Sequence, residues 1–250
     1  ASSFLAGRLD VPAEQVDQYH LRDFSLYQGR LYYPLGVLPA IFLLPGVAAF
    51  GLDFPQGALV LGLAASTGWL IYVIARRLNF SERDALWISA GVLIASPYPY
   101  LVLRATVFDA YLTHLLSFAC LLAALAEYFG KRRWWLCGLL VGLSALSRPL
   151  TVFAVIFFWL TAWQANGAKN SAAARLASLT IPVVLAGAVV VAYNQFRFGN
   201  PLEVGYSYQL MPGEVVAARN LGLFSFQHIP GNFQRAVLNG PRIIFAEKSQ

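Results

Sequence analysis

Charged residues are scarce in this chain, at 12% of its 250 residues, whereas soluble domains carry about 25%. Hydrophobic residues make up 58% of the sequence, and the mean hydropathy is +0.58. Apolar runs of the length that a helix needs to cross a bilayer, about 20 residues, recur along the chain. The composition therefore argues against a water-facing fold and predicts an integral membrane protein.

Cysteine is nearly absent as well, and both copies, Cys120 and Cys137, lie inside apolar runs. A disulfide scaffold is excluded, and neither residue has the spacing of a metal site. Residues 1–30 are polar, so we do not expect them to form a signal peptide. The net charge of +6 could indicate nucleic acid. Because most arginines flank apolar segments, however, we expect them to set membrane topology, with no nucleic-acid partner.

The predicted fold class is all-α, a polytopic transmembrane helical bundle with a juxtamembrane or re-entrant helix and an external loop region. The uncharged runs that support it are Leu31–Leu52, Phe54–Ala75, Ala85–Leu103, Ala110–Ala126, Trp134–Ser147, Pro149–Ala168 and Leu176–Phe196. We expect residues 1–30 to form an external loop, 31–196 the membrane domain with about six spans in 54–196, and 197–250 an external C-terminal segment.

The run 31–52 is the expected exception among these spans. Its prolines, Pro34, Pro39 and Pro45, should interrupt a regular helix. We therefore predict an element that dips into the membrane or lies on its surface. The alternative is a full span, which would place residues 1–30 in the cytoplasm.

Orientation follows from the positions of lysine and arginine. The short loops 76–85, 130–133 and 166–175 hold 8 basic residues in 24 positions, whereas residues 1–30 and 197–250 hold 8 in 84 positions. Short cytoplasmic loops are enriched in basic residues. The three loops are therefore predicted to be cytoplasmic and both terminal regions external.

Arg148 is the most informative ionisable residue, because it interrupts the apolar stretch 134–168 directly before Pro149. Intramembrane charges are costly and often functional. Arg148 could bind a phosphate through its fixed fork of donors. It could equally extend to the interface and mark a tight hairpin.

Arg104 and Asp109 bracket the next predicted external loop. Asp109 falls at the start of a helix, where a carboxylate is favoured as a cap. The alternative is an acid that lines a site shared with Arg104. His114, five residues after Asp109, is expected to form an interhelical hydrogen bond rather than to bind a metal.

The segment 17–34 is rich in acids, bases and tyrosines just before a membrane-embedded element. Its carboxylates, including Asp23, could act as a general base or bind a divalent metal. A solvated loop with an aromatic belt would have the same composition.

Three motifs stand out in the sequence: Asp23-x-Ser-x-x-x-Gly-Arg30-x-Tyr-x-Pro-x-Gly36, Gly138-x-x-x-Gly142-x-x-x-x-x-Arg148-Pro149, and Tyr193-Asn-Gln-Phe-Arg197-Phe-Gly199-Asn-Pro201-Leu-Glu203-x-Gly205-Tyr206-x-Tyr208. Together they resemble motifs of bacterial membrane glycosyltransferases of the C-type superfamily, the protein O-mannosyltransferase-like and aminoarabinose-transferase-like proteins.

The resemblance implies transfer of a sugar from a polyprenyl-phosphate-linked donor at the external, periplasmic face of the bacterial inner (plasma) membrane. An external carboxylate, Asp23 or Asp109, would deprotonate the acceptor, and Arg30, Arg104 and Arg148 would bind the phosphate leaving group. No cofactor is required by the motifs, and a divalent metal is left open.

One departure from the family pattern concerns its main catalytic acid, which follows the first transmembrane helix. Residues 1–10 resemble the stretch just after that acid, so we expect the first helix, the acid and a C-terminal part to lie outside this fragment. Asp10 and Asp17 are further candidates for the acid. The alternatives from other classes are a transporter or flippase, and a non-catalytic membrane scaffold.

Overall fold

The structure, a computed structural model, describes residues 1–15, 24–106, 109–165, 171–211, 216, 219–222 and 225–239. It is 74% helical, so the predicted helical class is confirmed apart from one small two-stranded sheet in the described part. The strands, β1 (Ser25–Tyr27) and β2 (Arg30–Tyr32), form an antiparallel hairpin. The longer helices are α2 (Leu38–Phe50), α3 (Gln56–Arg77), α4 (Glu82–Ile94), α5 (Tyr98–Ala105), α6 (Asp109–Tyr128), α7 (Trp134–Ser147), α8 (Val155–Gln164) and α9 (Ala172–Phe198).

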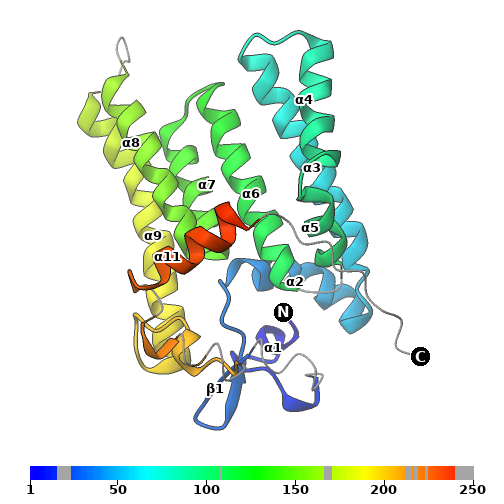
Figure 1. Cartoon of the computed structure of the whole chain (residues 1–250), viewed down its shortest axis with the longest axis vertical. Helices are drawn as coiled ribbons and strands as arrows, with labels where there is room; N and C mark the ends of the chain where they lie inside the picture. Colours follow the sequence, from blue (N-terminus) through cyan, green and yellow to red (C-terminus); the bar gives the residue numbers. More distant parts are fainter. Residues whose placement is uncertain are drawn as a thin grey trace.

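Short elements complete the path of the chain. They are α1 (Ser2–Leu5), η1 (Ala13–Gln15), η3 (Gly51–Asp53), η4 (Pro149–Ala154), η5 (Tyr206–Tyr208), α11 (His228–Phe233) and the π-helical turn η6 (Gln234–Leu238). α11 crosses the face of the bundle that Figure 1 presents to the viewer.

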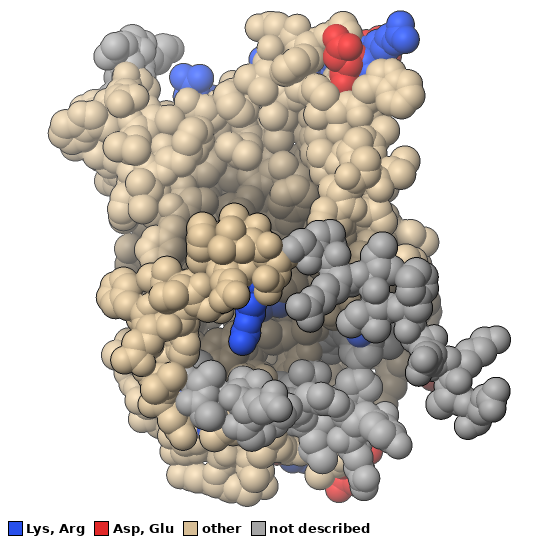
Figure 2. Space-filling view, viewed as in Figure 1, with Lys and Arg blue, Asp and Glu red and all other residues tan. Residues whose placement is uncertain are grey.

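The long helices run up and down between two ends of the molecule (Figure 1). The α3–α4 turn, the α6–α7 turn and the start of α9 lie together at one end, here called the basic end. The α5–α6 and α7–η4 junctions, the end of α9 and the β1–β2 hairpin lie at the other, here called the hairpin end. Figure 2 shows Lys and Arg side chains at the basic end. The loops 76–85 and 130–133 are thus neighbours, as the charge pattern predicts.

Arginines at the basic end also complete the hydrogen bonding of helix C-termini. Arg77 donates to the carbonyl of Ala126 near the end of α6. Arg175 donates through Nε to the carbonyl of Ala162 near the end of α8, at 2.8 Å. The last carbonyls of a helix lack intrahelical donors, and the helix dipole favours a cation there. These residues therefore have a structural role in addition to any effect on topology.

The helices long and apolar enough to span a membrane number three in the described residues: α3, residues 110–128 of α6, and α9. A fourth results if α4 and α5, bent by 55°, form one span. This count by length is lower than the predicted number of about six spans. The predicted break at Arg148-Pro149 is present, and the apolar segments on either side of it, the 14-residue α7 and residues 149–164, are too short to be counted by length. The predicted span 85–103 is bent at the prolines that open α5.

The run predicted to be juxtamembrane contains helix α2, which lies across the foot of the other helices (Figure 1). Helix α2 begins at Leu38 rather than at the predicted residue 31. Strand β2 and an irregular stretch occupy residues 30–37. The expectation that the prolines would interrupt it is wrong for two of them. Pro39 stands in the first turn, where no N–H partner is needed, and Pro45 lies inside a helix that continues to Phe50.

Helices α7 and α9 pack closely against each other in the core. A Cβ atom at Gly138 would overlap the carbonyl oxygen of Leu179, and one at Gly142 would lie 2.9 Å from the Cβ of Ala186. The prediction that this Gly-x-x-x-Gly pair permits close approach of a neighbouring helix is therefore confirmed.

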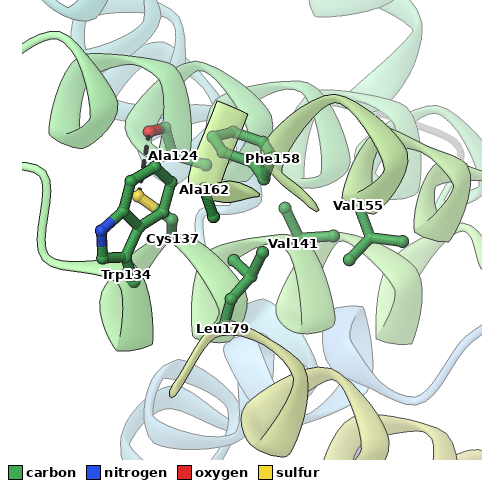
Figure 3. Close-up of a cluster of buried hydrophobic side chains, with 8 residues drawn as sticks. All are labelled: Ala124, Trp134, Cys137, Val141, Val155, Phe158, Ala162 and Leu179. Atoms are coloured by element: carbon green, nitrogen blue, oxygen red, sulfur yellow. Dashed lines mark hydrogen bonds between the residues drawn. The ribbon is translucent and has the colours of Figure 1, made fainter. Parts of the chain in front are cut away.

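Buried apolar side chains surround the α7–α9 contact (Figure 3). Phe158 of α8 and Val141 of α7 are at most 2% exposed, and the Cys137 thiol donates to the carbonyl of Ala124 at 3.7 Å. Cys137 is buried, Cys120 is half-buried and both are free, in agreement with the sequence prediction.

We predict that Gly138→Ala lowers the free energy of unfolding by about 1–3 kcal/mol, because α9 must move away from the added methyl group. The matched control is Gly187→Ala on α9, where a Cβ would meet nothing within 4 Å. It should be neutral or slightly stabilising, since alanine has the higher helix propensity. Thermal unfolding in detergent measures both variants. Equal stability of the two would contradict the close α7–α9 packing.

Candidate functional site

Arg148 lies at the hairpin end, between the last residue of α7 and the first residue of η4. Its Nη2 donates to the carbonyl of Ala110, at 3.0 Å, and approaches Nε2 of His114 at 2.6 Å. Because a guanidinium can only donate, His114 accepts at Nε2 and carries its proton on Nδ1. His114 therefore forms the interhelical hydrogen bond that the sequence predicts, and Arg148 is fixed against the first turns of α6.

Hydroxyl groups stabilise the helix break beside Arg148. Ser144 of α7 pairs with Ser117 of α6 at 2.7 Å between their hydroxyl oxygens, and both side chains are buried. Ser144 also donates to Thr151 of η4 at 2.8 Å, and Thr151 donates to the carbonyl of Arg148 at 2.7 Å. The network joins three elements, so the backbone of Arg148 is ordered where the helix ends.

A small cavity of about 30 Å³ lies beside Arg148, between the ends of α7 and α9 and the residues 34–37 and 204–206. Arg197 lines it from α9, together with Tyr193, Asn194 and Tyr206. No Asp or Glu is among the residues that line this cavity. The cavity therefore combines two positive charges with no compensating acid in its wall.

Arg197 is the residue of this cavity that sequence reasoning missed. It is only 4% exposed, and its Nη1 and Nη2 donate to the carbonyl of Tyr33 at 2.9 Å and to Oδ1 of Asn194 at 2.8 Å. Its guanidinium carbon lies 3.9 Å from the centre of the Tyr193 ring, in cation–π contact. In the sequence it stands at the end of an apolar run, where an arginine ordinarily extends to the interface.

Arg104 and Arg148 both contact the first turn of α6. The guanidinium of Arg104 lies 5.4 Å from the centre of the Tyr111 ring, and Arg148 bonds to the adjacent Ala110. The helix begins at Asp109, as the sequence predicts. The side chain of Asp109 lies outside the described part of the chain, so its pairing with Arg104 stays a prediction.

Arg30 borders a different cavity from Arg148. It is exposed on β2 and lines an open cleft of about 620 Å³ with Arg8, Asp10 and Glu14. Asp10 is buried and accepts two hydrogen bonds from Arg8, at 2.5 and 3.3 Å. The predicted phosphate-binding arginines therefore do not share one cavity: Arg148 lines the small cavity, Arg30 lines the open cleft with Asp10, and Arg104 lines neither.

Asp23 and Asp17 lie outside the described residues, so their predicted catalytic roles stay predictions. In the described part of the chain, no three His, Cys, Asp or Glu side chains gather in a way that could hold a metal ion. The expectation that a divalent metal could bind rested on the segment 17–34, of which residues 24–34 are described.

The third motif holds the hairpin against the end of α9. Ser25 donates to the carbonyl of Gly205 at 2.6 Å, and the ring of Tyr32 packs edge-on against Phe198 at 5.3 Å. Gly199, with a φ of +65°, ends α9 in the left-handed conformation that favours glycine. Packing thus accounts for several motif residues, and it fixes residues 33–37 over Arg197.

Comparisons with protein-family models, curated proteins and solved structures found no match to this chain. The resemblance to C-type glycosyltransferases therefore stays a prediction from sequence motifs. The role of the site is argued below from its geometry and charge.

We predict that Asp10→Asn weakens the acid dependence of stability. The hydrogen bond from Arg8 is the main cause that lowers the pKa of Asp10 below its ordinary value. Because the pKa of Asp10 is lower in the folded state, its carboxylate stabilises the fold at pH values above the pKa of the unfolded state, about 3.9. This stabilisation is lost as the pH falls through the pKa of the folded state. Tm measured from pH 6 to pH 3 should therefore fall less in the variant. Glu14→Gln, in the same cleft, is the control; equal acid profiles for Asp10→Asn and wild type would contradict the assignment.

Proposed function

We propose that this chain is the membrane-embedded part of a glycosyltransferase that uses a polyprenyl-phosphate-linked sugar, with Arg148 binding the phosphate. The observation that supports the proposal is the environment of the Arg148 guanidinium. Hydrogen bonds to α6 fix its guanidinium, yet it has no ion pair in the described residues and no acid lines its cavity. Arginine matches phosphate geometry through its planar fork of donors.

A polytopic arrangement in the bilayer is the second element of the proposal. The outward faces of the long helices carry large apolar side chains that would be unfavourable in water, among them Leu61 and Trp69 of α3 and Ile181 and Leu185 of α9, each at least 58% exposed. Hydrocarbon would cover such faces favourably. In the proposed orientation the basic end faces the cytoplasm. The hairpin end, with Arg148, then faces the periplasm of the bacterial inner membrane.

The proposed reaction is a single displacement at the anomeric carbon of the donor sugar. The acceptor oxygen attacks that carbon, the bond from carbon to phosphate oxygen breaks, and the lipid phosphate leaves with the electron pair. Arg148, with Arg104 of α5, which contacts the same turn of α6, would stabilise the negative charge of the leaving group. A carboxylate would take the acceptor proton; Asp23 and Asp109 are the candidates in this chain.

We predict that Arg148→Ala, in the full-length protein reconstituted with a polyprenyl-phosphate-linked sugar, lowers the transfer rate by about 10²-fold, the effect of losing one stabilising donor to a developing anion. Arg83→Ala is the matched control, because Arg83 is an exposed arginine at the start of α4, at the basic end. Arg148→Lys should recover part of the rate, since it retains the charge without the fork of donors.

Transfer at the wild-type rate by folded Arg148→Ala would remove Arg148 from the site. Binding of the lipid-linked sugar without transfer by the wild-type protein would instead favour the transporter or the scaffold. Membrane insertion and the melting temperature of each variant, measured in parallel, separate loss of function from loss of fold.

A further inference from the structure

We infer that Arg197 is the second cation of a phosphate-binding pocket that it shares with Arg148. The pocket is the 30 Å³ cavity between the ends of α7 and α9. The inference deepens the proposed function. It rests on that function only for the identity of the molecule that carries the phosphate. Neither the sequence motifs nor the comparisons give Arg197 a role.

The charges of the pocket are the first argument. Arg197 is 4% exposed, and neither Arg197 nor Arg148 forms an ion pair with a described acid. The nearby Glu203 uses Oε1 to accept from the backbone N–H groups of Gly205, at 2.6 Å, and Ser207, at 3.4 Å. Buried charges in proteins are as a rule paired, because desolvation of an isolated charge is costly. An anion in the cavity would supply the counter-charge that this wall lacks.

Unused hydrogen-bonding capacity is the second argument. Nη1 of Arg148 makes no hydrogen bond to any described residue, and Nε of both arginines is buried without a partner. Natural structures leave few buried donors unsatisfied, and each one calls for an explanation. The guanidinium of Arg197 is already oriented by the Tyr193 ring and by Asn194, so anion binding would need little further ordering.

The volume of the cavity limits which chemical group can enter it. A cavity of about 30 Å³ has room for roughly two waters, at about 10–15 Å³ each. That is room for two oxygens of a phosphoryl group whose phosphorus lies at the mouth of the cavity, whereas sites for whole small molecules enclose about 300–1,000 Å³. The sugar and the hydrocarbon chain of a lipid-linked donor would therefore lie outside the pocket, with only the phosphate between the arginines.

The alternative is that Arg197 is structural, since it joins α9 to the carbonyl of Tyr33. Two variants distinguish these roles. Arg197→Lys retains the positive charge but removes the planar fork. Val204→Phe fills the cavity from its wall while leaving both arginines in place.

The experiment measures binding of two probes to the whole chain in detergent or nanodiscs by calorimetry: inorganic phosphate and polyprenyl phosphate. We expect Arg197→Lys, Arg148→Lys and Val204→Phe each to weaken binding of at least one probe about 10-fold or more. The control Arg83→Lys should bind like wild type. Binding of both probes identifies a site for the phosphate itself, and binding of polyprenyl phosphate alone identifies a lipid headgroup site.

Wild-type binding by folded Arg197→Lys and Val204→Phe, with loss only in Arg148→Lys, would overturn the inference and leave the proposed function standing. Absence of binding of either probe to the wild-type chain would also overturn it. Loss of binding in all three variants, with unchanged sugar transfer by Arg148→Ala, would support the pocket and contradict the proposed glycosyltransferase.

Discussion

The close packing of α7 on α9 is the constraint on which the candidate site depends. Gly138 and Gly142 let the backbones approach until side chains of any size would overlap the partner helix. Both helices run toward the hairpin end, so the contact brings their last residues together (Figure 1). Arg148 follows the end of α7 and Arg197 lies in the last turn of α9. Two arginines 49 positions apart in the chain thereby line one cavity.

Hydropathy and charge were sufficient to predict the helical class and the proximity of the basic loops 76–85 and 130–133. They were insufficient for the course of each helix, because an uncharged run does not reveal where a helix bends. The run 85–103 reads as continuous, yet Pro97 and Pro99 open a new helix there and turn it by 55°. Conversely, Pro45 reads as a break and is accommodated inside α2.

For the candidate site as well, the sequence predicted local features but not those that depend on tertiary contacts. Arg148 could be singled out because it interrupts an apolar run, a property of the sequence alone. Arg197 could not, because its burial results from residues 33–37, which the β1–β2 hairpin and the third motif hold over the end of α9. Arg30 belongs to the first motif, but it lines the separate cleft beside Asp10, because it lies on strand β2. Position in a motif therefore did not predict which arginines converge.

The central claim is that phosphate binds between Arg148 and Arg197. The most direct measurement is an experimental structure of the full-length protein with polyprenyl phosphate bound. We expect the phosphorus atom in the cavity between the ends of α7 and α9, within hydrogen-bonding reach of both guanidinium groups. Phosphate in the cleft beside Arg30 and Asp10, with the cavity between the two arginines empty, would contradict the account.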